Sequence, residues 1–163
     1  MQQAKPEEPK ASCNEELGRK IIFPLDKSSN VQEAFEWFFK FGYRPADFVV
    51  FANVVQPTFI HGSISIGNSN FNPTEDFKLN FDEAHKIEEK YRELAKKAGV
   101  NFRTTCLADS DIADAINLLA EEEKANLIVA TALGESTYEV IVNSKIPVLV
   151  VPSEETDDQN CFI

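Results

Sequence analysis

The sequence has no long hydrophobic run. No apolar segment in its 163 residues approaches the roughly 20 that a membrane-spanning helix needs. The first residues, MQQAKPEEPK, also lack the apolar core of a secretory signal. We therefore expect a soluble, cytoplasmic protein that does not associate with membranes.

Positive charge and cysteine are also scarce. Lysine and arginine number 16 against 27 aspartate and glutamate, and the net charge of -11 repels the phosphates of nucleic acids and of anionic lipids. The three cysteines, Cys13, Cys106 and Cys161, lack metal-ligand spacing, and their odd number favours reduced thiols inside a cell. Cys106 stands in a strand pattern and is expected to be a small buried residue. Cys13 and Cys161 are expected to be exposed.

Patterns of catalytic and metal-binding residues are missing as well. The two histidines, His61 and His85, have no cysteine or second histidine at ligand spacing. No nucleophile elbow with a Ser-His-Asp order and no His-Glu-x-x-His motif occurs. We expect no metal site and no catalytic residue, which favours a protein that is not an enzyme.

What the sequence does contain is a regular alternation of strand and helix patterns between two polar ends. Residues 1–17 and 153–163 are expected to be flexible tails around one domain at 18–152. Strands are predicted at 20–25, 47–55, 101–108, 126–131 and 147–151, and helices through 31–39 and at 80–98, 109–125 and 136–144. Gly99 is the predicted stop of the second helix.

This alternation predicts a mostly parallel five-stranded sheet with helices on both faces. Ligands in such folds bind beyond the carboxyl ends of the strands, where the strand order reverses. If the first and fourth strands are neighbours, the loops that begin at Asp26 and Ala130 meet at that point.

Four segments carry a family resemblance. KIIFPLDKSSN, NVVQP, LIVATALG and IPVLVVP resemble, in this order, the strand ends and the glycine loop of the universal stress protein family, over about Arg19 to Pro152. The resemblance implies a Rossmann-like fold of the adenine nucleotide alpha hydrolase type, with strand order 3-2-1-4-5. It also implies a homodimer, and some members of the family bind ATP.

The resemblance also places the ligand. Asp26 matches the aspartate that holds adenosine in binding members, and Asn53 and Val54 fall at the strand end that faces adenine. The alternative role for this loop is capping of the first helix by Ser28, Ser29 or Asn30, and capping is predicted first for Ser29 and Asn30. The predicted ligand-binding residues are Asp26, Lys27, Ser28, Asn53, Val54 and Thr131.

The family's phosphate loop, Gly-x-x-Gly-x9-Gly-Ser/Thr, is not matched. Thr131 stands at its first glycine, Gly134 matches both of the later ones, and Glu135 stands at the Ser/Thr. We interpret this as a phosphate loop shortened to a turn. Gly134 is expected to supply a φ that other residues tolerate poorly, and Glu135 to favour the dipole of the next helix.

Two further segments have open interpretations. The long loop at 56–76 carries apolar residues that either fill the ligand crevice or cover a small adenine-type ligand. Trp37, opposite the Phe stripe of its helix, contacts a partner or covers a tail. The last strand would leave an unpaired edge, so a homodimer through this strand is expected, with contacts by Val148, Leu149, Val150 and Val151.

Two functions compete. The first is a dimeric regulatory or interaction module of the stress response that has lost triphosphate binding and needs no cofactor. The alternative is a protein that binds ATP or AMP with magnesium, with slow ATPase activity, in which Lys27 or Lys145 supplies positive charge. A third class, another α/β enzyme with the 56–76 loop as a lid, has no catalytic residues to support it.

Overall fold

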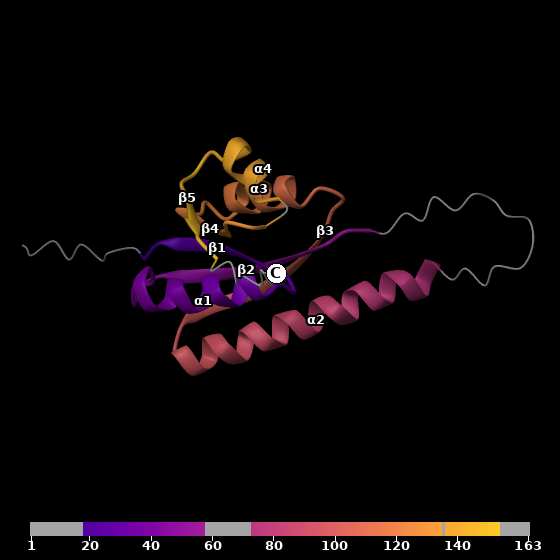
Figure 1. The fold of residues 1–163 in the computed structure, drawn as a ribbon, viewed down its shortest axis with the longest axis horizontal. Coiled ribbons are helices and arrows are strands. Elements are labelled where there is room, and N and C mark those ends of the chain that lie inside the picture. Colours follow the sequence, from indigo (N-terminus) through magenta and orange to yellow (C-terminus); the bar gives the residue numbers. More distant parts are fainter. Residues whose placement is uncertain (1–17, 58–72, 135, 154–163) are drawn as a thin grey trace, which may run out of the picture.

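The computed structural model describes residues 18–57, 73–134 and 136–153, with residues 73–80 described by their backbone alone. Within these ranges five strands alternate with four helices (Figure 1). In chain order they are β1 (Lys20–Leu25), α1 (Ser29–Phe41), β2 (Phe48–Val55), α2 (Pro73–Ala98), β3 (Asn101–Ala108), α3 (Ile112–Glu122), β4 (Leu127–Thr131), α4 (Thr137–Asn143) and β5 (Val148–Val151). The predictions for the tails, for Cys13, His61, Glu135 and Cys161, and for most of the 56–76 loop lie outside the described residues.

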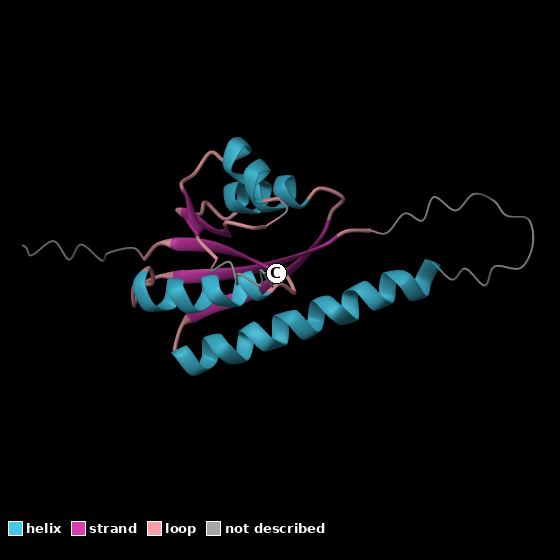
Figure 2. Ribbon diagram, in the orientation of Figure 1, coloured by secondary structure: helices cyan, strands magenta, loops and turns pink. Residues whose placement is uncertain are grey.

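All the strands pair in parallel, in the order β3-β2-β1-β4-β5, as predicted. Helices α1 and α2 cover one face of the sheet, and α3 and α4 cover the other (Figure 2). The order reverses between β1 and β4, because the chain moves outward to β2 and β3 before it returns to the far side of β1. This is the switch point at which α/β folds place their ligands.

The two faces of the sheet have different cores. Alternate residues of a strand point to opposite faces, so Ile21, Phe23 and Leu25 lie on the α1 and α2 side while Ile22 lies on the other. The α1 and α2 side is aromatic, and the rings of Phe23 and Phe51 are 5.7 Å apart. The α3 and α4 side is built from smaller aliphatic residues. The unbroken apolar sequence of β2 reflects burial on both faces.

Helix boundaries differ from the predictions in two places. Helix α2 starts at Pro73 rather than near residue 80, because proline is well tolerated in the first turn of a helix. Residues 73–76 are therefore helical and not part of a loop. The N-cap of α1 is Ser28, the third candidate, although its side chain makes no capping hydrogen bond. The preferred capping by Ser29 and Asn30 is therefore wrong. Gly99, with φ +66°, follows the last residue of α2 as predicted.

Cys106 is exposed, so the prediction of a buried residue is wrong. The cause is the place of β3 at the edge of the sheet, where β2 is its one neighbour among the described strands. Partial burial and then the negative charge of Glu88 raise the pKa of the thiol above its ordinary value. An apolar strand pattern alone does not distinguish an edge strand from a central one.

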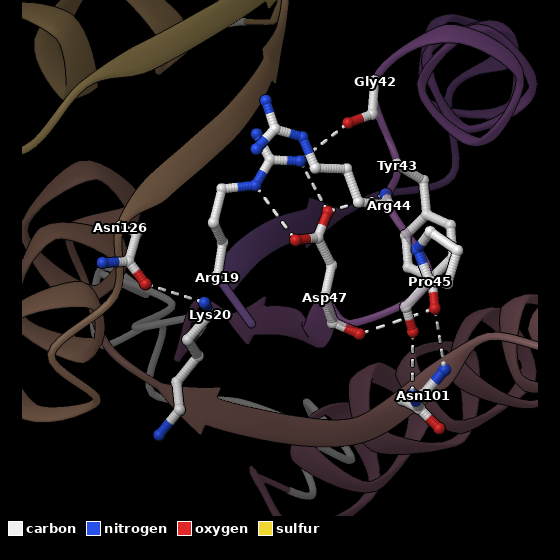
Figure 3. Close-up of polar contacts among 9 residues, drawn as sticks. All are labelled: Arg19, Lys20, Gly42, Tyr43, Arg44, Pro45, Asp47, Asn101 and Asn126. Atoms are coloured by element: carbon white, nitrogen blue, oxygen red, sulfur yellow. Dashed lines mark hydrogen bonds and ion pairs between the residues drawn. The ribbon is translucent and has the colours of Figure 1, made fainter. Parts of the chain in front are cut away.

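An ion pair joins the amino-terminal ends of β1 and β2 (Figure 3). The Nε of Arg19 donates to Oδ1 of Asp47 at 3.0 Å, and its Nη2 donates to Oδ2 and to the carbonyl oxygen of Gly42. The backbone N–H of Arg44 donates to Asp47 Oδ2 at 2.8 Å. Burial alone would raise the pKa of Asp47, but the hydrogen bonds and the charge of Arg19 together lower it. The carboxylate is therefore held ionised at 1% exposure.

None of the described helices combines the length and the apolar character that crossing a membrane requires.

Candidate functional site

A cavity of about 640 Å³ lies at the carboxyl ends of β1, β2 and β4, on the switch point of the sheet. All four helices contribute to its wall, three of them by residues near their amino-terminal ends. This volume falls within the range of small-molecule sites. The loops that begin after β1 and β4 meet here, as the sequence predicts.

Most of the wall is apolar. Its aliphatic side chains come from both faces of the sheet and include Val31, Ala34, Val54, Ala84, Ile87, Ile112, Ile116, Val129 and Val140. Polar groups are contributed mainly by the ends of the strands and the turns that follow them, at Asp26, Ser28, Asn53, Gln56, Thr131, Ser136 and Thr137. An apolar body with few polar groups around it is typical of a ligand site.

The structure brings all six predicted ligand-binding residues to this cavity, together with Gly134. They come from three separate strand ends, which the order of the strands places side by side. Contact of any of the six with a ligand stays a prediction.

Asp26 shapes the turn from β1 into α1. Its Oδ1 accepts a hydrogen bond from the backbone N–H of Ser28 at 2.7 Å, and the side chain is exposed at the rim of the cavity. Such a bond is the usual Asx turn, which positions the start of a helix. The charge of Asp26 also reaches Tyr91, whose pKa is raised to about 12 by burial first and then by Asp26 and Glu36.

The lysines named for a phosphate role do not form a cationic site. Lys27 lines the cavity, but its side chain is 77% exposed and its Nζ lies 3.7 Å from Oε1 of Glu83. Lys145 precedes β5, at the other end of the sheet, and pairs with Glu121 at 2.9 Å. The suggestion that Lys145 supplies charge to the site is therefore wrong.

Asn53 is buried, and its side chain holds α2 against β2. The amide Nδ2 donates to the backbone carbonyl of Ala84 at 3.2 Å. One of its two amide hydrogens is thus engaged within the protein. The side chain therefore has a structural role beside any role in ligand binding.

The turn after β4 is closed by its own hydrogen bonds. The carbonyl of Thr131 accepts from the N–H of Gly134 at 3.3 Å and from the hydroxyl of Thr137 at 2.7 Å. The N–H of Thr137 donates to the carbonyl of Gly134 at 3.1 Å, and the N–H of Ala132 donates to Val151. The N–H groups of Ala132, Gly134 and Thr137 are therefore engaged within the protein.

The predicted reason for a glycine at position 134, a backbone φ that other residues tolerate poorly, is wrong. Among the described glycines Gly99 has a positive φ, whereas Gly134 does not. A Cβ at Gly134 would instead lie 2.5 Å from the hydroxyl oxygen of Thr137 and 3.0 Å from that of Thr131. Glycine is needed here for space rather than for backbone conformation.

Within the described residues no group of three or more His, Cys, Asp and Glu side chains could hold a metal ion. His85 lies exposed on α2.

The sequence model of the universal stress protein family matches residues 18–152. The chain belongs to the universal stress protein family. The resemblance that the four segments carry is thereby confirmed, and the fold agrees with it. No protein with a curated description matches the chain.

Solved structures of universal stress proteins share the fold. A family member from Burkholderia pseudomallei has 18% identity and a TM-score of 0.67, and the match covers 84% of this chain and 98% of that one. A family protein from Arabidopsis thaliana with AMP bound has 16% identity and a TM-score of 0.63, over 84% and 93% of the two chains. The universal stress protein of Archaeoglobus fulgidus in complex with dAMP has 18% identity and a TM-score of 0.62, over 82% and 98%.

Sequence reasoning missed two residues of this universal stress protein that shape the site. Thr137 closes the turn after β4 with its hydroxyl, and Glu83 pairs with Lys27 at the cavity. Thr137 had a signal in the sequence, since Ser and Thr at a helix start often bond to a nearby backbone group. Glu83 had none, because it lies far from Lys27 along the chain.

Proposed function

We propose that this universal stress protein is a regulatory or interaction module that does not hold a nucleoside triphosphate. The observation that carries the proposal is the closed turn after β4, in which the amides of Ala132, Gly134 and Thr137 donate within the protein. A triphosphate site needs several free amides aimed at the anion, with a helix start or a cation behind them. Helix α4 spans seven residues, too short for a strong dipole.

The charges around the cavity also support this proposal. In the described part of the chain its wall carries two carboxylates, Asp26 and Glu83, and one ammonium, that of Lys27. Lys27 lies beside Glu83, so its charge is partly offset before any ligand arrives. A triphosphate would enter a site that is on balance negative.

Thermal unfolding with Mg-ATP tests the proposal. Saturable binding at a ligand concentration about 100 times Kd would add about 2.7 kcal/mol to the free energy of unfolding, which is a shift of several degrees in Tm. We expect no saturable shift with Mg-ATP and no release of phosphate. A saturable rise in Tm at micromolar Mg-ATP would overturn the proposal.

A second candidate function is binding of an adenine nucleotide through its adenosine half. It is favoured by the cavity itself, which brings Asp26, Asn53 and Val54 together at adjacent strand ends. Relatives with bound AMP and dAMP have the same fold. Titration with adenosine, AMP, ADP and ATP tests this function. This function predicts that Asp26→Ala weakens nucleotide binding. Glu122→Ala, on the exposed side of α3, should not weaken it. If none of the four compounds binds the unchanged protein, this candidate function is wrong.

We also propose that two copies of the chain pair through β5. This strand, Val148–Val151, forms one edge of the sheet, and such an edge carries unpaired backbone N–H and C=O groups. Tyr138, Ile141 and Val142 on the preceding helix, α4, are exposed apolar side chains. A two-fold axis at the edge of β5 would pair the strand with itself and cover part of this apolar surface.

A further inference from the structure

We infer that the cavity at the switch point takes an uncharged, largely apolar small molecule and discriminates against anionic ones. The inference rests on the proposed function, since it concerns the same cavity after triphosphates are set aside. It adds the chemical class of ligand, argued from the wall, its charges and its free hydrogen-bonding groups.

The wall provides an apolar surface large enough for a small molecule. Val54, Ile87 and Ile112 are half-buried and Leu133 is exposed, and all four line the cavity of about 640 Å³. Water in such a space lacks hydrogen-bond partners on the aliphatic sides. Its displacement by an apolar ring or chain is therefore favourable.

Charge at the rim opposes an anion. Asp26 and Glu83 are both exposed at the cavity, and the Nζ of Lys27 stays within 3.7 Å of Glu83. No second lysine and no arginine lines the cavity within the described ranges. At an effective dielectric constant of about 20, like charges about 10 Å apart repel strongly enough to shift affinity by about tenfold, and closer charges shift it by more.

The polar groups at the rim select for hydrogen-bond donors on the ligand. Asp26 uses Oδ1 to accept from Ser28, and a carboxylate has a second oxygen with which to accept another bond. Several donors that could serve an anion are engaged, because Asn53 donates one amide hydrogen to Ala84 and the N–H groups of Gly134 and Thr137 donate within the chain. The ligand therefore carries a hydroxyl or amine near Asp26 and an apolar body inside.

Two fluorescent probes that differ by one charge test the inference. N-phenyl-1-naphthylamine is neutral, and 8-anilino-1-naphthalenesulfonate is the same ring system with a sulfonate. We expect the full chain to bind the neutral probe about tenfold more tightly than the sulfonate. Asp26→Asn should reduce the ratio of the two affinities by about threefold. Glu122→Gln, which removes an exposed carboxylate elsewhere, should leave the ratio unchanged.

A filled cavity provides the second test. Ile112→Trp places a large ring at a half-buried position in the wall, at the first residue of α3, and should weaken binding of the neutral probe by about tenfold or more. Leu118→Trp is the matched control, because Leu118 lies on the same helix, is 57% exposed and does not line the cavity. Should Ile112→Trp not fold, Val54→Phe on β2 fills the same space.

Three outcomes overturn the inference: equal or tighter binding of the sulfonate, unchanged binding in a folded cavity-filling variant, or no binding of the neutral probe. A parallel titration with Mg-ATP keeps the two proposals apart. If ATP binds saturably, the proposed function is wrong. If neither ATP nor the neutral probe binds, the proposed function stands and only the inferred class of ligand is wrong.

Discussion

At the scale of single residues, the carboxylate of Asp47 is a polar anchor between the starts of β1 and β2. It is buried and accepts from both the side chain of Arg19 and the N–H of Arg44. We predict that Asp47→Asn lowers the free energy of unfolding by about 2 kcal/mol or more, because Arg19 loses its counter-charge in a part-buried place. Urea unfolding measures this change. Glu93→Gln, which breaks an exposed ion pair with Lys96, should leave the urea midpoint unchanged.

The contribution of Asp47 should depend on pH with a definite sign. Its pKa in the folded protein is lowered, so folding favours the ionised form. The stabilisation is therefore fully present above the unfolded value of about 3.9 and is lost as the pH falls through the folded pKa. The difference in stability between the unchanged protein and Asp47→Asn should shrink as the pH falls below about 4. A difference that grows on acidification would contradict the assignment.

Tyr91 differs from Asp47, because its buried polar group has no hydrogen bond within the described residues to offset the cost of burial. Its side chain is 1% exposed, and its hydroxyl has no hydrogen-bond partner in the described part of the chain. Because an unsatisfied buried hydroxyl costs free energy, we predict that Tyr91→Phe is neutral or stabilises the protein by up to about 1 kcal/mol. Tyr43→Phe is the control that should destabilise, since the Tyr43 hydroxyl accepts from the N–H of Asn101. A loss of stability in Tyr91→Phe would show that its hydroxyl has a partner.

At the scale of elements, the turn between β4 and α4 is held by its own hydrogen bonds. The backbone of Gly134 passes so close to the Thr137 hydroxyl that a Cβ has no room. We predict that Gly134→Ala lowers the free energy of unfolding by about 1–2 kcal/mol through this overpacking. In the double variant with Thr137→Ala the closer of the two clashes is removed, so the combined loss should be smaller than the sum of the single losses. Thermal unfolding of the four proteins measures the cycle, and strict additivity would contradict a direct contact.

Elements were predictable from the sequence where the periodic pattern was strong. The Phe stripe of α1 and the apolar run of β2 indicate their elements without any neighbour, because periodicity is local. The start of α2 was not predictable in this way, since the helix begins at Pro73, well before the apolar stripe that marks its later turns. The exposure of Cys106 follows from the place of β3 at the edge of the sheet, which the predicted strand order implied and the apolar pattern of the strand did not show.

At the scale of the whole molecule, the open edge of β5 leads to a prediction about assembly. We expect the protein to be a dimer in solution and Val150→Lys to yield monomers. A two-fold axis through paired β5 strands would place the two new charges near each other. Ala108→Lys, at an exposed position on the opposite edge strand β3, should leave the dimer intact. Light scattering after size-exclusion chromatography gives the mass, and a monomeric unchanged protein would end this proposal.

The sequence by itself determined the order and type of the elements, the family, and which loops follow the strands, because these depend on local periodicity and on motifs in a fixed order. Tertiary structure alone decided that the Gly134 turn uses its amides within the chain and that a Cβ has no room at Gly134. It also placed Glu83 beside Lys27 and Lys145 away from the cavity. The charge of a site and its free hydrogen-bond donors depend on distances between residues far apart in the chain, and these distances exist only after folding.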